Sequence, residues 1–173
     1  MTSHSLTLDA EALYAALRDA VRRQLAERPG ASLAGIWSGG AWLASRLQAD
    51  LGLAGEAGVI TSTLHRDDFA ERGLAGDGGA TKLPFEIEGR HVVLIDDVLY
   101  TGRTIRAVLN ELFDFGRPAS VSLAVLVDRG GRELPIDARY CALRLAQPLA
   151  ANRNLRLERD ADGAFSLRLI DTA

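Results

Sequence analysis

Two adjacent carboxylates, Asp96 and Asp97, follow the apolar run 92–95, whose β-branched residues are typical of a strand buried on both faces. The pair is expected to end that strand and to place negative charge where open α/β sheets bind ligands. A turn containing Thr101 and Gly102 then leads into a helical pattern, whose first backbone N–H groups suit a phosphate. Carboxylates for ribose hydroxyls beside an anion-binding turn predict a site for a ribose phosphate.

Each part of this segment is a weak signal by itself. A pair of aspartates is most often a solvated strand end or a helix cap, and Thr-Gly-Arg-Thr contains common helix-start residues. Their fusion into one strand–turn–helix unit is far more specific. The chain contains neither a Walker loop nor a Gly-x-Gly-x-x-Gly run, so a dinucleotide site is not indicated.

The segment 96–104 resembles the phosphoribosyl-diphosphate (PRPP) motif of type I phosphoribosyltransferases, in the version carried by the PyrR family. PyrR proteins are pyrimidine operon regulators that also act as uracil phosphoribosyltransferases. Residues 63–68 are similar to the family's Thr-Leu-Tyr-Arg-Asp-Asp. Further similarity lies in residues 116–118, 123–130 and 132–136, and the resemblance covers roughly residues 6–142.

The resemblance implies transfer of phosphoribose from PRPP to uracil, which gives UMP and diphosphate. It implies a type I phosphoribosyltransferase fold, an α/β fold with a mostly parallel central sheet flanked by helices. Asp96 and Asp97 are the implied catalytic residues, and Mg²⁺ is expected to bind with PRPP, with these two carboxylates as candidate protein contacts. The implied 5′-phosphate site comprises Val98, Leu99, Tyr100, Thr101, Gly102, Arg103 and Thr104. The implied diphosphate site comprises Ser38, Gly39, Gly40 and Arg66, and the implied base wall comprises Val127, Asp128 and Arg129.

The diphosphate loop departs from the family pattern. That loop usually reads Lys-Thr-Arg-Gly, whereas this chain has Trp37-Ser38-Gly39-Gly40, without either basic residue. Glycines still allow backbone amides to face an anion. We expect Arg66, on a glycine-rich loop over about residues 65–82, to supply charge by closing over the diphosphate.

Two other functions remain open. The first is an RNA-binding regulator that senses UMP, for which Arg18, Arg22, Arg23, Arg28 and Arg132 are the basic candidates. Acidic residues interrupt the first helix and Gly131 replaces a His common in the family motif, which favours scattered arginines on a solvated face. The second is a purine phosphoribosyltransferase, although the run around Asp128 favours uracil. Glu133 and Arg132 are expected to form a surface ion pair or an interface contact.

Composition sets broad limits on the protein class. The chain has 173 residues and a formal net charge of −3, which suits one domain and argues against broad nonspecific nucleic-acid binding. With one cysteine, Cys141, no intrachain disulfide can form, and a cytoplasmic protein is expected. No membrane partner is indicated, because no apolar run approaches about 18 residues. A homodimer or higher homo-oligomer is expected, with Trp42 and Leu43 at an interface.

Periodicity predicts alternating helices and strands, and therefore a parallel sheet. The first helix is expected to begin at the cap Asp9 and to end at Pro29-Gly30, and Ser38 to Gly40 are expected to form a tight loop before a second helix. The tail alternates around Asp160-Ala161-Asp162-Gly163, which predicts a β-hairpin. The other predicted elements are strands at 33–37, 59–64, 90–97, 120–127 and 139–143, and a helix at 101–115.

Overall fold

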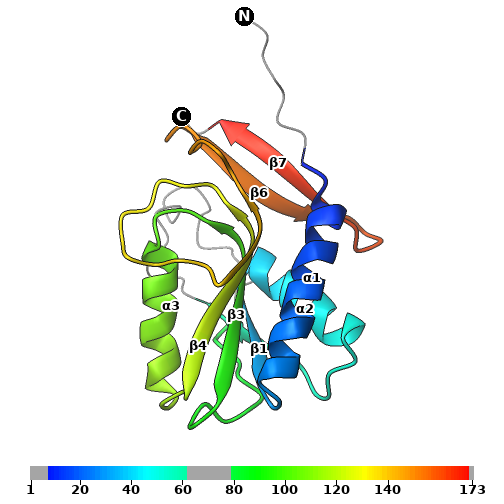
Figure 1. Cartoon of the computed structure of the whole chain (residues 1–173), viewed down its shortest axis with the longest axis vertical. Helices are drawn as coiled ribbons and strands as arrows, with labels where there is room; N and C mark the ends of the chain where they lie inside the picture. Colours follow the sequence, from blue (N-terminus) through cyan, green and yellow to red (C-terminus); the bar gives the residue numbers. More distant parts are fainter. Residues whose placement is uncertain (1–7, 62–78, 172–173) are drawn as a thin grey trace, which may run out of the picture.

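The computed structural model describes residues 8–61 and 79–171 (Figure 1). Among these residues, three helices are interspersed with strands up to residue 114, and four consecutive strands follow. The helices are α1 (Ala10–Glu27), α2 (Gly39–Asp50) and α3 (Arg103–Asp114). The strands are β1 (Ser32–Ile36), β2 (Gly58–Ile60), β3 (His91–Leu99), β4 (Ser120–Asp128), β5 (Tyr140–Arg144), β6 (Arg153–Arg159) and β7 (Phe165–Asp171).

The main sheet has five strands in the order β2-β1-β3-β4-β5, and every neighbouring pair is parallel. The predicted parallel sheet is confirmed, and β3, which carries the two aspartates, is its middle strand. The predicted hairpin is also confirmed: β6 and β7 pair antiparallel, with Arg159 opposite Phe165. In Figure 1 this hairpin lies beyond the carboxyl ends of the β3 and β4 strands.

Helices cover both faces of the main sheet, with α1 and α2 on one side and α3 on the other (Figure 1). Val93 and Ile95 pack in the cluster that includes α1 and α2, whereas Val92 and Leu94 pack in the cluster that includes α3. Burial on both faces is the physical reason for the uninterrupted apolar run in β3.

The boundaries near the predicted site differ from the expected ones. β3 does not end at the aspartates but continues to Leu99, because β4 runs beside it and pairs Val98 with Val127 and Leu99 with Asp128. Helix α3 begins at Arg103 rather than at residue 101. The backbone hydrogen bonds of a long neighbouring strand outweigh the low strand preference of two aspartates.

Two further predictions need correction. Leu43 is fully buried in the core, so the prediction that it lies at a subunit interface is wrong. Gly39 and Gly40 form the first turn of α2 rather than a loop before it. Most of the loop predicted at about residues 65–82 lies outside the described residues, so its mobility stays a prediction. Two residues in its described end accept hydrogen bonds from Thr61: the Thr81 hydroxyl from its N–H, and the Gly79 carbonyl from its hydroxyl.

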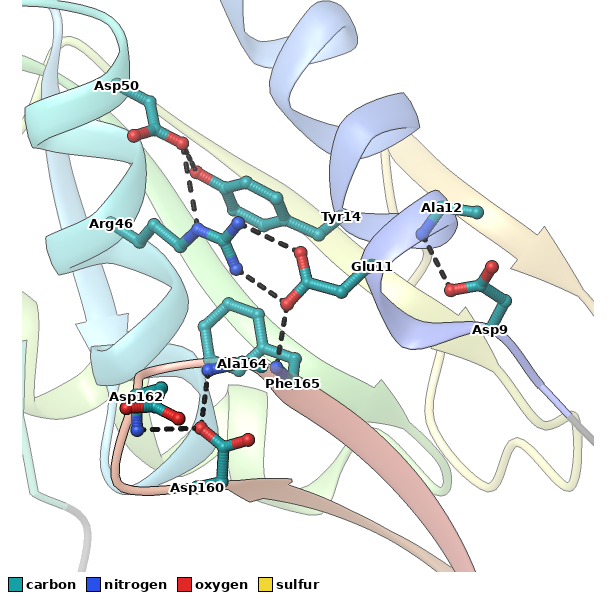
Figure 2. A network of polar contacts seen from close by, with 10 residues as sticks. All are labelled: Asp9, Glu11, Ala12, Tyr14, Arg46, Asp50, Asp160, Asp162, Ala164 and Phe165. Carbon is teal, nitrogen blue, oxygen red and sulfur yellow. Dashed lines mark hydrogen bonds and ion pairs between the residues drawn. The ribbon is translucent and has the colours of Figure 1, made fainter.

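A polar network joins the hairpin to α1 and α2. Figure 2 shows the guanidinium of Arg46 between the side chains of Glu11 and Asp50 and against the rings of Tyr14 and Phe165. Arg46 donates two hydrogen bonds to the Glu11 carboxylate, at 2.8 and 2.9 Å, and lies 4.2 Å from the centre of the Tyr14 ring. Glu11 also accepts a hydrogen bond of 2.7 Å from the backbone N–H of Phe165, at the start of β7.

The pH dependence of stability is expected to report this network. The Arg46 hydrogen bond holds the pKa of Glu11 below its ordinary value of 4.5, so the contribution of Glu11 to stability is present above that pH and is lost as pH falls through the lowered value. Glu11→Gln should reduce the free energy of unfolding by about 1 kcal/mol at pH 7, because it removes the ion pair with Arg46. The loss stays this small because solvent partly screens the pair. Urea denaturation at pH 7 and pH 3 checks this. A difference that is as large at pH 3 as at pH 7, or an equal loss in the control Glu27→Gln, would contradict it.

Candidate active site

The two aspartates lie near the carboxyl end of the middle strand. Asp96 is nearly buried, with 6% of its surface exposed, and its Oδ1 accepts a hydrogen bond of 3.0 Å from the backbone N–H of Asp97. Asp97 is half-buried, and its Oδ1 accepts a hydrogen bond of 3.0 Å from the N–H of Val98. Asp97 lies on the α2 side of β3, because its side chain is in contact range of Gly39 at the start of that helix. The sheet therefore presents one of the two carboxylates to the first turn of that helix.

Two glycines bring the first turn of α2 against β3. A Cβ atom on Gly39 would lie 2.5 Å from Oδ2 of Asp97, and one on Gly40 would lie 2.2 Å from the carbonyl oxygen of Ile95. Only glycine permits so close an approach without displacement. Ser38, joined to Trp37 by a cis peptide bond, precedes the helix without a side-chain capping hydrogen bond. The N–H groups at this helix start therefore lie beside Asp97, where they can face an anion.

A second turn follows β3 and leads into α3. Gly102 precedes α3 with φ of +92°, a left-handed conformation that favours glycine. The hydroxyl of Thr101 accepts a hydrogen bond of 3.2 Å from the N–H of Arg103, and its carbonyl accepts 3.0 and 3.1 Å hydrogen bonds from the N–H groups of Glu133 and Leu134. These contacts hold the turn, and with it the start of α3, at the carboxyl end of β3.

The turn is shorter than the predicted 5′-phosphate site. Val98 and Leu99 belong to the β3–β4 ladder, and the side chain of Leu99 is buried in the core. Of the expected 5′-phosphate residues, Tyr100–Thr104 therefore form the turn, whereas Val98 and Leu99 belong to the strand. Within the turn, the Arg103 side chain pairs with Glu133 at 2.6 Å, with both side chains about half exposed, so its charge is directed to that carboxylate. The expected surface ion pair of Glu133 is thus present, with Arg103 as its partner.

The predicted base wall lies at the end of β4. Val127 is fully buried and Asp128 is 1% exposed. The Asp128 carboxylate pairs with Arg132 at 2.6 Å and with Arg144 at 3.5 Å, and it also accepts a hydrogen bond from the N–H of Gly130. Because these side chains are already engaged, a base at this edge would be recognised through backbone groups. Arg129 is equally buried and makes contacts of its own.

Sequence reasoning missed the internal roles of two arginines. Arg132, expected at the surface, donates hydrogen bonds to the nearly buried Asp128 carboxylate and to the carbonyl of Tyr100. Arg144, at the end of β5, reaches the same carboxylate from the neighbouring strand. The spacing of Asp128 and Arg132, four residues apart, was the only sequence signal for the first pair, whereas nothing local marks the second.

The remaining expectations concern Arg66 and bound metal. Arg66 lies outside the described residues, so its proposed contact with diphosphate stays a prediction. Among the residues that the structure describes, no cluster of three or more His, Cys, Asp or Glu side chains could hold a metal ion by itself. A cavity of about 520 Å³ lies between α2 and the hairpin turn, but none of the predicted site residues lines it. Two charged residues in its lining, Glu11 and Arg46, form an ion pair with each other.

The comparison with known proteins identifies the family. The phosphoribosyl transferase domain model matches residues 9–153. A curated relative, the bifunctional protein PyrR of Ralstonia nicotianae, is 54% identical over 95% of this chain and 92% of its own length. This chain belongs to the PyrR family of phosphoribosyltransferases. The bifunctional protein PyrR of Nitrosococcus oceani is 43% identical over 96% of this chain and 95% of its own length.

Solved structures confirm the fold of this PyrR-family chain. A hypoxanthine-guanine phosphoribosyltransferase from Bacillus anthracis superposes with a TM-score of 0.63 at 16% identity, covering 82% of this chain and 85% of the other. A hypoxanthine phosphoribosyltransferase from Staphylococcus aureus gives 0.61 at 21% identity, covering 82% and 77%. At these identities the likeness establishes the type I phosphoribosyltransferase fold alone. The sequence relatives are PyrR proteins, so the purine alternative is not favoured.

Proposed function

We propose that this PyrR-family protein transfers phosphoribose from PRPP to uracil, giving UMP and diphosphate. The observation that carries the proposal is the packing of the α2 turn against Asp97, with a Cβ on Gly39 only 2.5 Å from its carboxylate. The Asp97 carboxylate and the first turn of α2 therefore lie at the same edge of the sheet. At this edge β3 leads into the second turn, Tyr100–Thr104. A ribose carrying a phosphate at one end and a diphosphate at the other matches this arrangement.

The carboxylates serve the ribose. In the reaction the anomeric C–O bond of PRPP breaks, a C–N bond to uracil N1 forms, the N1 proton is released and diphosphate leaves. Positive charge develops on the ribose as the leaving group departs, and fixed negative charge nearby stabilises it. We assign this role to Asp97, which faces α2, and to Asp96 beside it; both can also accept hydrogen bonds from the ribose hydroxyls.

Backbone N–H groups serve the two anions. We assign the 5′-phosphate to the turn Tyr100–Thr104 and the diphosphate to Ser38, Gly39 and Gly40. Asp96 and Asp97 are the residues that would hold a Mg²⁺ ion, which would take most of its oxygen ligands from PRPP and water. Within residues 8–61 and 79–171 no third His, Cys, Asp or Glu joins them in a metal-binding cluster. When bound, Mg²⁺ neutralises charge on the diphosphate.

A second role as an RNA-binding regulator that senses UMP is proposed from the relatives, whose names describe them as bifunctional. In this chain Arg18 and Arg22 both pair with Asp19, at 3.4 and 3.2 Å, which reduces the positive charge that α1 offers to RNA.

A homo-oligomer also stays a proposal. The two residues expected at its interface are engaged within the chain: Leu43 is buried, and Trp42 lies against Arg159, 5.0 Å from its guanidinium.

A panel of bases tests the proposed transfer. The purified protein is incubated with PRPP and Mg²⁺ and with uracil, hypoxanthine, guanine or orotate, and each nucleotide product is quantified. Formation of UMP alone is the expected result. A purine nucleotide as the main product would overturn the assignment of the base, and no product with any base would leave nucleotide sensing as the function to pursue.

A further inference from the structure

Arg129, the residue that follows β4, is the largest of the fully buried side chains in the described part of the chain, with 1% of its surface exposed. Its Nη1 donates a hydrogen bond of 2.8 Å to Oδ1 of Asn154 in β6, and its Nη2 donates one of 3.1 Å to the carbonyl of Ala150. Its guanidinium carbon lies 3.9 Å from the centre of the Tyr100 ring. One side chain thus connects the end of β4, the hairpin and the residue that opens the phosphate-binding turn.

The Tyr100 ring is held tightly between its neighbours. Besides the Arg129 guanidinium on the ring, Arg132 donates a hydrogen bond to the Tyr100 carbonyl. A Cβ on Gly131 would lie 2.5 Å from Cε2 of the ring, so the chain after Arg129 also closes on it. Because Tyr100 immediately precedes the turn at Thr101, a shift of the ring would move the backbone N–H groups that we assign to the 5′-phosphate.

The charge of Arg129 is buried close to this turn. Burial lowers the pKa of the guanidinium, yet arginine starts so high that the group keeps its proton at neutral pH. Among residues 8–61 and 79–171, no carboxylate forms an ion pair with Arg129, because the adjacent Asp128 is taken by Arg132 and Arg144. The Nε of Arg129 is also without a hydrogen-bond partner within that part of the chain. A buried cation that lacks an anion favours the binding of one nearby.

We propose that Arg129 is a positioning residue of the phosphoribosyl site, whose guanidinium fixes the Tyr100 ring against the hairpin and places positive charge behind the 5′-phosphate-binding turn. The inference rests on the proposed function, since it requires a phosphorylated ribose at that turn. It assigns to the C-terminal hairpin a part in substrate affinity, transmitted through Asn154, Arg129 and Tyr100.

Binding and turnover together test this role. Ribose 5-phosphate binding is measured by calorimetry without base, and kcat and the KM values for PRPP and uracil are measured separately, for Arg129→Met and Arg129→Lys. Arg129→Met should weaken ribose 5-phosphate binding and raise the KM for PRPP about tenfold, with a smaller effect on kcat, because a positioned phosphate contact is lost in ground and transition states alike. Arg129→Lys should recover part of the affinity, since it keeps the charge but not the planar contacts.

The Tyr100 ring provides an independent test if Arg129→Met fails to fold. Tyr100→Leu should weaken ribose 5-phosphate binding more than Tyr100→Phe does, because phenylalanine keeps a ring for the guanidinium. In the double variant with Arg129→Lys, the loss from Tyr100→Leu should be smaller than in the wild-type background, as expected for coupled residues. Equal effects of the two Tyr100 variants would overturn the proposal.

Arg153→Met is the matched control, because Arg153 lies on the same hairpin in an exposed pair with Asp171 at 3.0 Å. It should leave binding and turnover unchanged. Unaltered ribose 5-phosphate affinity in folded Arg129→Met, or an equal loss in Arg153→Met, would overturn the role of Arg129. The wild-type protein could bind ribose 5-phosphate in a way that depends on Arg129 and yet turn over no base; the proposed transfer would then fail, but the role of Arg129 would stand. If the protein binds neither ribose 5-phosphate nor PRPP, both proposals fail.

Discussion

Asp97→Asn is expected to lower kcat for UMP formation about 10²–10³-fold, the usual loss when one preorganised electrostatic contact to a transition state is removed. Asparagine keeps the shape of the side chain and can still hydrogen-bond a ribose hydroxyl, so the KM for PRPP should change much less. The half-buried carboxylate faces the α2 turn, which makes it the better placed of the two aspartates to act on the ribose–diphosphate bond. Steady-state kinetics with PRPP, Mg²⁺ and uracil measure both quantities.

The matched control for this variant is Asp114→Asn, which removes the charge of an exposed aspartate at the end of α3. It should retain wild-type kcat and KM. An Asp97→Asn protein with kcat within threefold of wild type would show that this carboxylate does not stabilise the transition state, whatever its effect on the binding of PRPP.

Gly39→Ala is expected to lower kcat/KM about 10²-fold, because a methyl group at this position must displace either Asp97 or the α2 turn, and displacements of about 1 Å have such effects. The added Cβ would lie 2.5 Å from Oδ2 and 2.7 Å from Cγ of Asp97, well inside van der Waals contact. The loss tests whether the helix start and the carboxylate form one site. Kinetics are to be compared with the free energy of unfolding from urea denaturation, so that lost activity is separated from lost fold.

Gly79→Ala is the control for the added methyl group, since a Cβ there meets no atom of the described residues within 4 Å. It should alter neither kcat/KM nor stability. Normal activity in Gly39→Ala would mean that the α2 turn and Asp97 can separate freely, which contradicts a shared site.

The sequence allowed the fold to be predicted because its local signals agree with the tertiary structure. The apolar run of β3 is buried by helices on both faces, and the hairpin turn at residues 160–163 joins two alternating strands. The extension of β3 to Leu99 could not be predicted, because it depends on how far β4 runs beside it. Local preference fails where a neighbouring strand supplies the hydrogen bonds.

The backbone turns of the candidate site have local signals in the sequence, whereas the contacts of its arginines have none. The turn after β3 has local signatures in Gly102 and Thr101, which a sequence displays directly. The contacts of Arg129 with Asn154 and Tyr100 join residues 25 and 29 positions away, and no local pattern specifies such pairs. These contacts form only because the hairpin packs against the end of the sheet.

The absence of both basic residues from the diphosphate loop makes turnover the most direct test of this account. The measurement is the uracil-dependent formation of UMP and of diphosphate by the wild-type protein with PRPP and Mg²⁺, both quantified in the same reaction. Equimolar UMP and diphosphate, absent when uracil is omitted, is the predicted result, because the glycine-lined α2 turn presents backbone N–H groups beside Asp97. Diphosphate release without UMP, or neither product, would contradict phosphoribosyl transfer to uracil at this site.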